Sequence, residues 1–226
     1  MKPARIAGIP GEVALQLLAA GLLAVAILAV TLLAPTEHSM GHAQRILYLH
    51  VAVAWLGLAC LPAAGVCGGL YLRRRNLAWD HWSQAALEIG WLASGLTLIT
   101  GSLWARAAWG TWWTWDPRLT NALVLWTIYC GLLLVRSALE EPHRRARLGA
   151  VLAMVAAFDV PLVILATRWF RGVHPVAPQM EPAMRLALLL SIAGFTALFA
   201  ALLVRRRRQL HLAARIMTLD DRTTES

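Results

Sequence analysis

Six long apolar segments constrain the fold of this chain more than any other feature of its sequence. They cover residues 13–34, 46–72, 83–104, 117–138, 148–169 and 183–204. Each is long enough to cross the roughly 30 Å hydrocarbon core of a bilayer, which takes about 20 residues of helix. A bilayer offers no water to pair with open backbone groups, so a helix is the expected form of each segment. We therefore predict an all-α protein, with residues 1–226 forming one integral membrane bundle of six transmembrane helices.

The composition agrees with this class and argues against two others. Of the 226 residues, 59% are hydrophobic and 15% are charged, whereas a soluble domain carries about 25% charged residues. The net charge is +9, but the basic residues stand in short clusters between apolar segments, as topology signals do. We therefore expect membrane lipid around the chain and no nucleic acid. Because the chain has one lysine, Lys2, and no GxxxxGK[ST] motif, it cannot itself be a P-loop ATPase.

The basic residues also predict which side of the membrane each connecting segment faces. If both chain ends are placed inside, 15 of the 21 lysines and arginines fall in inner segments. This excess predicts cytoplasmic N- and C-termini. The six basic residues on the outer side are Arg45, Arg106, Arg118, Arg168, Arg171 and Arg185.

A tryptophan-rich segment (104–117) follows the third apolar segment, and we expect it to form an outer loop. Its five tryptophans are Trp104, Trp109, Trp112, Trp113 and Trp115. One or two tryptophans per helix end are usual at a membrane–water boundary. Five in one loop indicate, in addition, an aromatic surface for a large planar ligand. Asp116 is suited to cap the next helix, and Pro117 to be its first residue.

Two histidines on the predicted outer side are candidate iron ligands. His50 lies about one turn inside the second apolar segment, where an imidazole loses hydration and needs a partner. His174 lies in the loop before the sixth segment. Taken alone, His50 is explained by a hydrogen bond to a neighbouring helix, and His174 by an ordinary solvated loop. Together, beside the tryptophan-rich segment, they can supply both axial nitrogen ligands of a haem iron.

Charged residues of the outer half add to this hypothesis. Haem carries two propionate carboxylates, which arginines bind in a bidentate way. The candidates are Arg45, Arg118, Arg168 and Arg171, and an ordinary interfacial role is an equal alternative for each. Asp159 lies inside the fifth segment, two residues before Pro161. An acid within the membrane is a functional candidate, but this one can equally bond backbone groups that the proline frees.

Four short segments resemble the cytochrome c maturation protein C (CcmC) family. GSLW (101–104) and WGTWWTWDPRLT (109–120) resemble the tryptophan-rich signature of that family. RILYLHVAVAW (45–55) and DVPLVILATRWFRGVHP (159–175) resemble its two histidine segments. With six predicted spans, the resemblance covers nearly the whole chain.

The resemblance implies a haem-handling protein of the bacterial inner membrane that is not an enzyme and whose haem site faces the periplasm. It implies haem (heme b) as the bound group, with His50 and His174 as its axial ligands. The tryptophans of the loop and Asp116 would form the platform that presents haem. The implied partners are a haem chaperone of the CcmE type, the ABC transporter subunits CcmA and CcmB, and a small membrane subunit, CcmD.

The residues alone leave two other classes open. A cytochrome b-like electron-transfer subunit also needs histidine ligands, but it usually carries them within helices, whereas His174 is in a loop. A solute permease favours broken helices and polar groups at mid-membrane. Asp159 and Pro161 are the only such features in this sequence.

Overall fold

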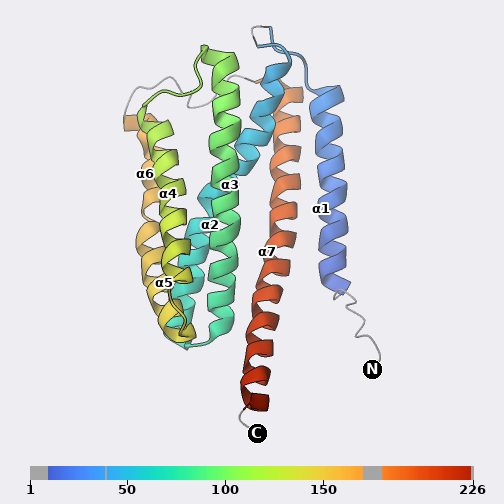
Figure 1. Ribbon diagram of the computed structural model, residues 1–226. Helices are drawn as coiled ribbons and strands as arrows, with labels where there is room; N and C mark the ends of the chain where they lie inside the picture. Colours follow the sequence, from blue (N-terminus) through green and yellow to red (C-terminus); the bar gives the residue numbers. More distant parts are fainter. Residues whose placement is uncertain (1–9, 39, 170–179, 225–226) are drawn as a thin grey trace.

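The computed structural model describes residues 10–38, 40–169 and 180–224, which form helices joined by short turns (Figure 1). The helices are α1 (Pro10–Leu28), α2 (Ile46–Arg74), α3 (Leu77–Trp109), α4 (Pro117–Ser137), α5 (Pro142–Ala156), α6 (Asp159–Trp169) and α7 (Pro182–Thr224). A π-helical turn (Ala29–Leu33) extends α1, and a 3-10 turn (His42–Arg45) leads into α2. Within these residues, six helical segments are long and apolar enough to cross a membrane. The predicted all-α bundle of six spans is therefore confirmed.

Several helix boundaries differ from the predicted segments: α1, α3 and α5 begin three to six residues earlier, and three further differences are larger or bear on the site. Helix α3 continues past residue 104 to Trp109, so part of the expected loop is helical. Helix α7 continues through the expected polar tail, because arginines end a membrane span but are good helix formers. The fifth segment is divided into α5 and α6 at residues 157–158. The break lies four residues before Pro161. In a continuous helix the proline ring would clash with the carbonyl group at that position, and proline has no N–H to bond it.

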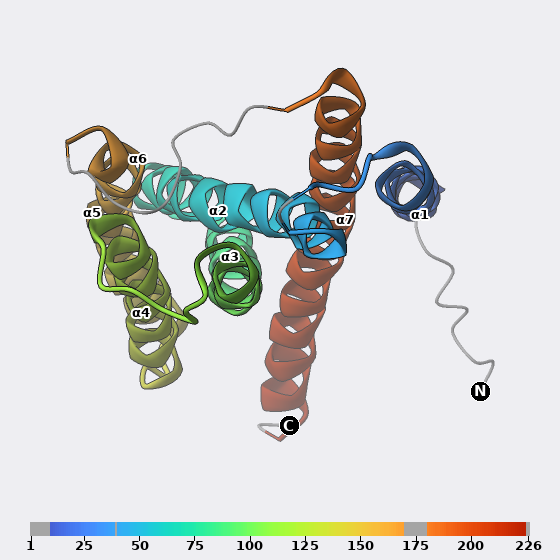
Figure 2. The same ribbon diagram turned by 90° about the horizontal axis from the view of Figure 1, so that it is seen from above.

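Helix α2 lies between α7 on one side and α5 and α6 on the other, while α1 stands at the edge beside α7 (Figure 2). Glycines of α2 allow its closest contacts. A Cβ added to Gly57 would lie 3.2 Å from the Cα of Ser94 on α3, and one added to Gly68 would lie 2.9 Å from the Cα of Ala150 on α5. In lipid, close packing of small residues replaces the hydrophobic effect as the force between helices.

A buried ion pair connects the beginning of α3 to the end of α4. Arg136 donates to the carboxylate of Asp80 at 2.9 Å, and each side chain is only 3% exposed. The same guanidinium donates to Gln84 Oε1 at 3.2 Å. Gly149 of α5 leaves the space that this guanidinium occupies, because a Cβ there would overlap Arg136 Nη1. This cluster lies at the opposite end of α3 from the tryptophan-rich segment.

Candidate functional site

The first two tryptophans of the tryptophan-rich segment are held by the last turns of α3. Trp104 is buried, and its ring meets that of Trp109 edge to face, with centroids 5.3 Å apart and an interplanar angle of 82°. Helix α3 ends at Gly110, which has φ +73°, a left-handed conformation that glycine adopts without a steric penalty. The helix therefore fixes this pair of indoles, and Gly110 turns the chain away from it.

The other three tryptophans lie in the turn between α3 and α4 (Figure 1). Trp113 and Trp115 also meet edge to face, with centroids 5.7 Å apart. Trp112 is 55% exposed and Trp115 is 76% exposed. Arg106 donates to the Gly110 carbonyl, and its guanidinium carbon lies 5.9 Å from the Trp112 ring centre, within cation–π range. The turn thus presents aromatic surface outward on a backbone that side chains hold in place.

Asp116 caps α4, as the sequence predicted, and Pro117 is its first residue. One carboxylate oxygen, Oδ1, accepts from the backbone N–H groups of Arg118 (3.0 Å) and Leu119 (2.9 Å). The second oxygen is buried and has no hydrogen-bond partner among the residues that the structure describes. The same holds for Trp113 Nε1 and Thr114 Oγ1. Buried polar atoms left unpaired are costly and uncommon. Three of them in one short turn form a polar surface that can complete its hydrogen bonds with water or with a bound ligand.

His50 lies on α2 and contacts α3 one turn before Trp104. Its Nδ1 is 3.1 Å from the hydroxyl oxygen of Thr100. A Cβ added to Gly101 would lie 2.9 Å from His50 Cε1, so the imidazole fills the space that this glycine leaves. Thr100 and Trp104 are four residues apart and therefore share one face of α3. The structure accordingly places the imidazole against the face of α3 that also carries a tryptophan of the segment.

The hydrogen bonds around Thr100 assign the proton of His50. The Thr100 hydroxyl donates its single proton to the Leu96 carbonyl at 2.7 Å. In the arrangement that satisfies both contacts it accepts from His50, which places a proton on Nδ1 and, in a neutral imidazole, the lone pair on Nε2. Histidines that bind a metal are usually oriented in this way, with one ring nitrogen donating a hydrogen bond while the other coordinates the metal. Sequence reasoning missed Thr100 and noted Gly101 only as part of the GSLW segment, although their helical spacing from Trp104 was a usable signal.

Several other predicted residues lie elsewhere or outside the described part of the chain. His174 and Arg171 belong to residues that the structure does not describe, as does the side chain of Arg168, so the convergence of two histidines stays a prediction. Arg45 donates to the Thr31 carbonyl at 3.2 Å, and it connects the start of α2 to the end of the first span. Arg118 lies half-buried in the first turn of α4.

The acidic residues of the predicted apolar segments, Glu88 and Asp159, have different surroundings. Glu88 pairs with Arg206 of α7 at 3.0 Å. Asp159 is the first residue of α6, and its Oδ2 is buried without a hydrogen-bond partner among the described residues. That oxygen does not bond the backbone groups around Pro161, which was one of the two expected explanations.

Comparison with known proteins gives one consistent result. The model of the family "CcmC: Heme exporter protein C" matches residues 2–222. Heme exporter protein C of Bradyrhizobium diazoefficiens is 34% identical over 193 residues, which cover 82% of this chain and 73% of the relative. The protein of the same name from Escherichia coli K12 is 34% identical over 186 residues, covering 79% and 74%. That of Rhodobacter capsulatus is 35% identical over 196 residues, covering 83% and 81%.

Proposed function

Because the chain belongs to the heme exporter protein C (CcmC) family, we propose that it is the membrane component of a haem export system for c-type cytochrome biogenesis. In this role the chain has no catalytic chemistry of its own, and haem is the cargo that its tryptophan-rich end binds. A separate ABC transporter, formed by subunits of the CcmA and CcmB type, supplies the ATPase, and a small subunit of the CcmD type completes the complex.

The arrangement of His50 is the observation that carries this proposal. Its Nδ1–H is committed to Thr100, so Nε2 presents the lone pair that an iron ion takes from a neutral imidazole. The neighbouring indoles supply flat apolar faces of the kind that pack against a porphyrin. The unpaired donors of the turn, Trp113 Nε1–H and Thr114 Oγ1–H, match a ligand that combines a flat apolar body with carboxylate groups.

The remaining roles follow from the chemistry of haem. His174 is the second axial ligand. The propionates are bound by arginines from the set Arg45, Arg118, Arg168 and Arg171. The exposed rings of Trp112 and Trp115 lie at the edge that a chaperone of the CcmE type reaches from the periplasm. The chaperone takes haem there, at the outer face of the inner membrane, from a site that water-soluble proteins can approach.

Changing Trp112 and Trp115 together to alanine tests this transfer step. We expect the variant to keep its haem on His50 but to load the chaperone about tenfold less. The reason is that the two aromatic rings at the edge that the chaperone reaches are lost. The measurement is covalent haem on a co-expressed CcmE-type chaperone, detected by haem staining after denaturing electrophoresis. Trp91→Ala is the matched control, since Trp91 is 40% exposed but lies at the middle of α3. Undiminished loading by the double variant would contradict the proposed transfer edge.

Asp116→Asn separates helix capping from haem handling. Asparagine keeps one oxygen for the N–H groups of Arg118 and Leu119, but it replaces the unpaired Oδ2 with an NH2 donor. We expect near-normal thermal stability with haem occupancy reduced severalfold, because Oδ2 no longer accepts from the O–H of a protonated propionic acid group, the hydrogen-bond donor that haem can offer. Asp116→Ala also loses the cap, at a cost of about 1 kcal/mol. The readouts are the melting temperature and the Soret absorbance per protein. Normal haem occupancy in the asparagine variant would show that Asp116 acts only as a helix cap.

A further inference from the structure

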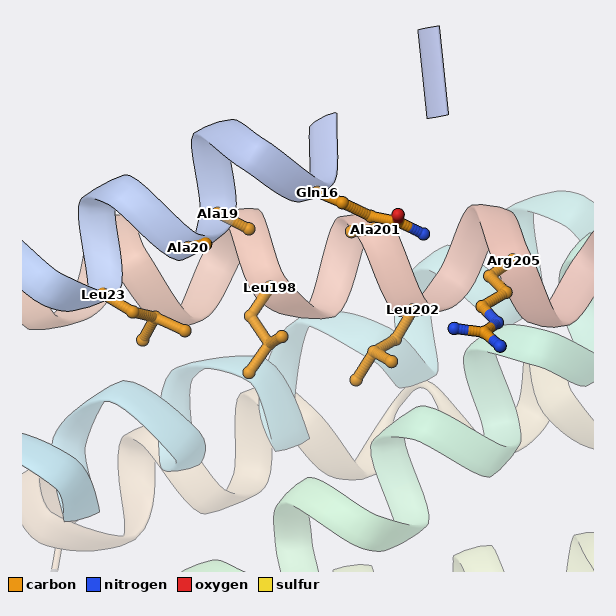
Figure 3. A pocket seen from close by; sticks show the side chains of 8 residues that line it. All are labelled: Gln16, Ala19, Ala20, Leu23, Leu198, Ala201, Leu202 and Arg205. Carbon is orange, nitrogen blue, oxygen red and sulfur yellow. The ribbon is translucent and has the colours of Figure 1, made fainter. Parts of the chain in front are cut away.

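Helices α1 and α7 enclose a groove that lies apart from the proposed haem site (Figure 3). Its volume is about 270 Å³. Alanines and leucines of both helices line most of its length, among them Ala20, Leu198 and Leu202. Two polar residues, Gln16 and Arg205, lie toward the same end (Figure 3). The groove is therefore apolar along its length and polar at one end.

Arg205 is the first of four consecutive arginines and differs from the other three in its contacts. The partners of those three are Glu88 for Arg206 at 3.0 Å, the Trp82 ring for Arg207 at 5.4 Å, and Glu12 of α1 for Arg208 at 2.7 Å. Within the described part of the chain, Arg205 has no hydrogen bond and no ion pair, and it is exposed. A guanidinium is thus held beside the groove without a protein carboxylate to neutralise it.

This combination fits an anionic phospholipid better than other occupants. Arginine binds phosphate oxygens in a bidentate way, and clusters of arginine at the end of a membrane span attract anionic headgroups. The apolar lining suits an acyl chain, whereas a free phosphate gains contacts only with Gln16 and Arg205 at the polar end. We infer that the groove between α1 and α7 binds one acyl chain of an anionic phospholipid, with its phosphate against Arg205.

The location gives such a lipid a structural role. Helix α1 stands at the edge of the bundle, beside α7 (Figure 2). The ion pair of Glu12 with Arg208 holds the first turn of α1 to α7. Gly194 allows a second close contact further along α1, since an added Cβ would lie 3.2 Å from the Leu22 carbonyl oxygen. A lipid chain fills the space between these two contacts and adds apolar packing that the two helices do not provide for each other.

Native mass spectrometry of the full-length protein in detergent tests the inference. The protein is offered equal amounts of phosphatidylglycerol and phosphatidylcholine, with inorganic phosphate in a parallel sample. We expect the wild type to retain phosphatidylglycerol about fivefold better than phosphatidylcholine, as one favourable cationic contact allows. Arg205→Gln should remove this preference, and Arg205→Lys should keep most of it. Ala20→Leu should lower retention of both lipids, because Ala20 is exposed at the groove and the larger side chain fills it.

Arg73→Gln is the matched control, because Arg73 is an exposed arginine at the end of α2 and its loss changes the net charge equally. The inference is overturned if Arg205→Gln keeps the preference or if Arg73→Gln loses it to the same degree. Unchanged lipid retention in Ala20→Leu also overturns it. Displacement of phosphatidylglycerol by an equal concentration of inorganic phosphate would show a simple anion site instead.

Discussion

Replacing either His50 or His174 with alanine is expected to remove most of the haem that copurifies with this protein and to abolish loading of the chaperone. If both imidazoles are axial ligands, each variant leaves the iron with one protein nitrogen. Changes to residues that only orient a metal ligand already cost about 10–100-fold in affinity, so losing a ligand should cost at least as much. The measurement is the Soret absorbance per protein, with haem quantified as the pyridine complex.

Two further variants make this experiment specific. Thr100→Val removes the hydroxyl that fixes the Nδ1 proton of His50, and it should lower haem content less than His50→Ala does. His42→Ala changes an exposed histidine in the 3-10 turn before α2 and should leave the haem content unchanged. If both His50→Ala and His174→Ala carry normal haem, the assigned ligands are wrong and the family membership alone remains.

The features that were predictable from the sequence depend on local chemistry. Segment length and hydrophobicity were sufficient for the six spans, because the bilayer imposes both. The Asp116–Pro117 pair predicted the start of α4, because capping preferences involve only neighbouring residues. The end of α3 was predicted too early, at residue 104, because the predicted apolar segment ends before the helix does. The helix continues until Gly110, whose positive φ ends it.

The features that were not predictable depend on contacts between distant segments. The sequence indicated that His50 needs a partner but not that Thr100 provides it, since 50 positions separate the two. Likewise, Tyr129 of α4 donates to the Gly57 carbonyl at 2.8 Å and occupies the space that a side chain at Gly90 would fill. Such pairings depend on which helices are neighbours and at what register, and apolar periodicity does not encode either.

Arg136 illustrates the same limit. From the sequence it counted as one of the inner basic residues that set orientation. In the structure it is 3% exposed and paired with Asp80. Its Nε and Nη1 atoms have no hydrogen-bond partner among the described residues. The charge of the buried Arg136 guanidinium is compensated by one carboxylate, that of Asp80. Removing either partner of a buried pair leaves an uncompensated charge.

We therefore expect Asp80→Leu and Arg136→Met, made separately, each to destabilise the protein by about 3–5 kcal/mol. The double variant should recover most of this loss, because two apolar side chains of similar volume leave no charge buried. Thermal unfolding in detergent measures the effect for the wild type, both single variants and the double variant. Glu88→Gln is the control: its pair with Arg206 is partly exposed, at 25% and 40%, and should contribute no more than about 1 kcal/mol.

The double variant also separates stability from haem handling. Asp80 lies in the first turn of α3, whereas Trp109 is its last residue, so the ion pair and the proposed haem site lie at opposite ends of one helix. If Asp80 and Arg136 only compensate each other's buried charge, the double variant should fold and load the chaperone like the wild type. If the double variant is as unstable as the single ones, the ion pair itself specifies how α3 and α4 pack. If it is stable but transfers no haem, this end of α3 is coupled to the site at the other.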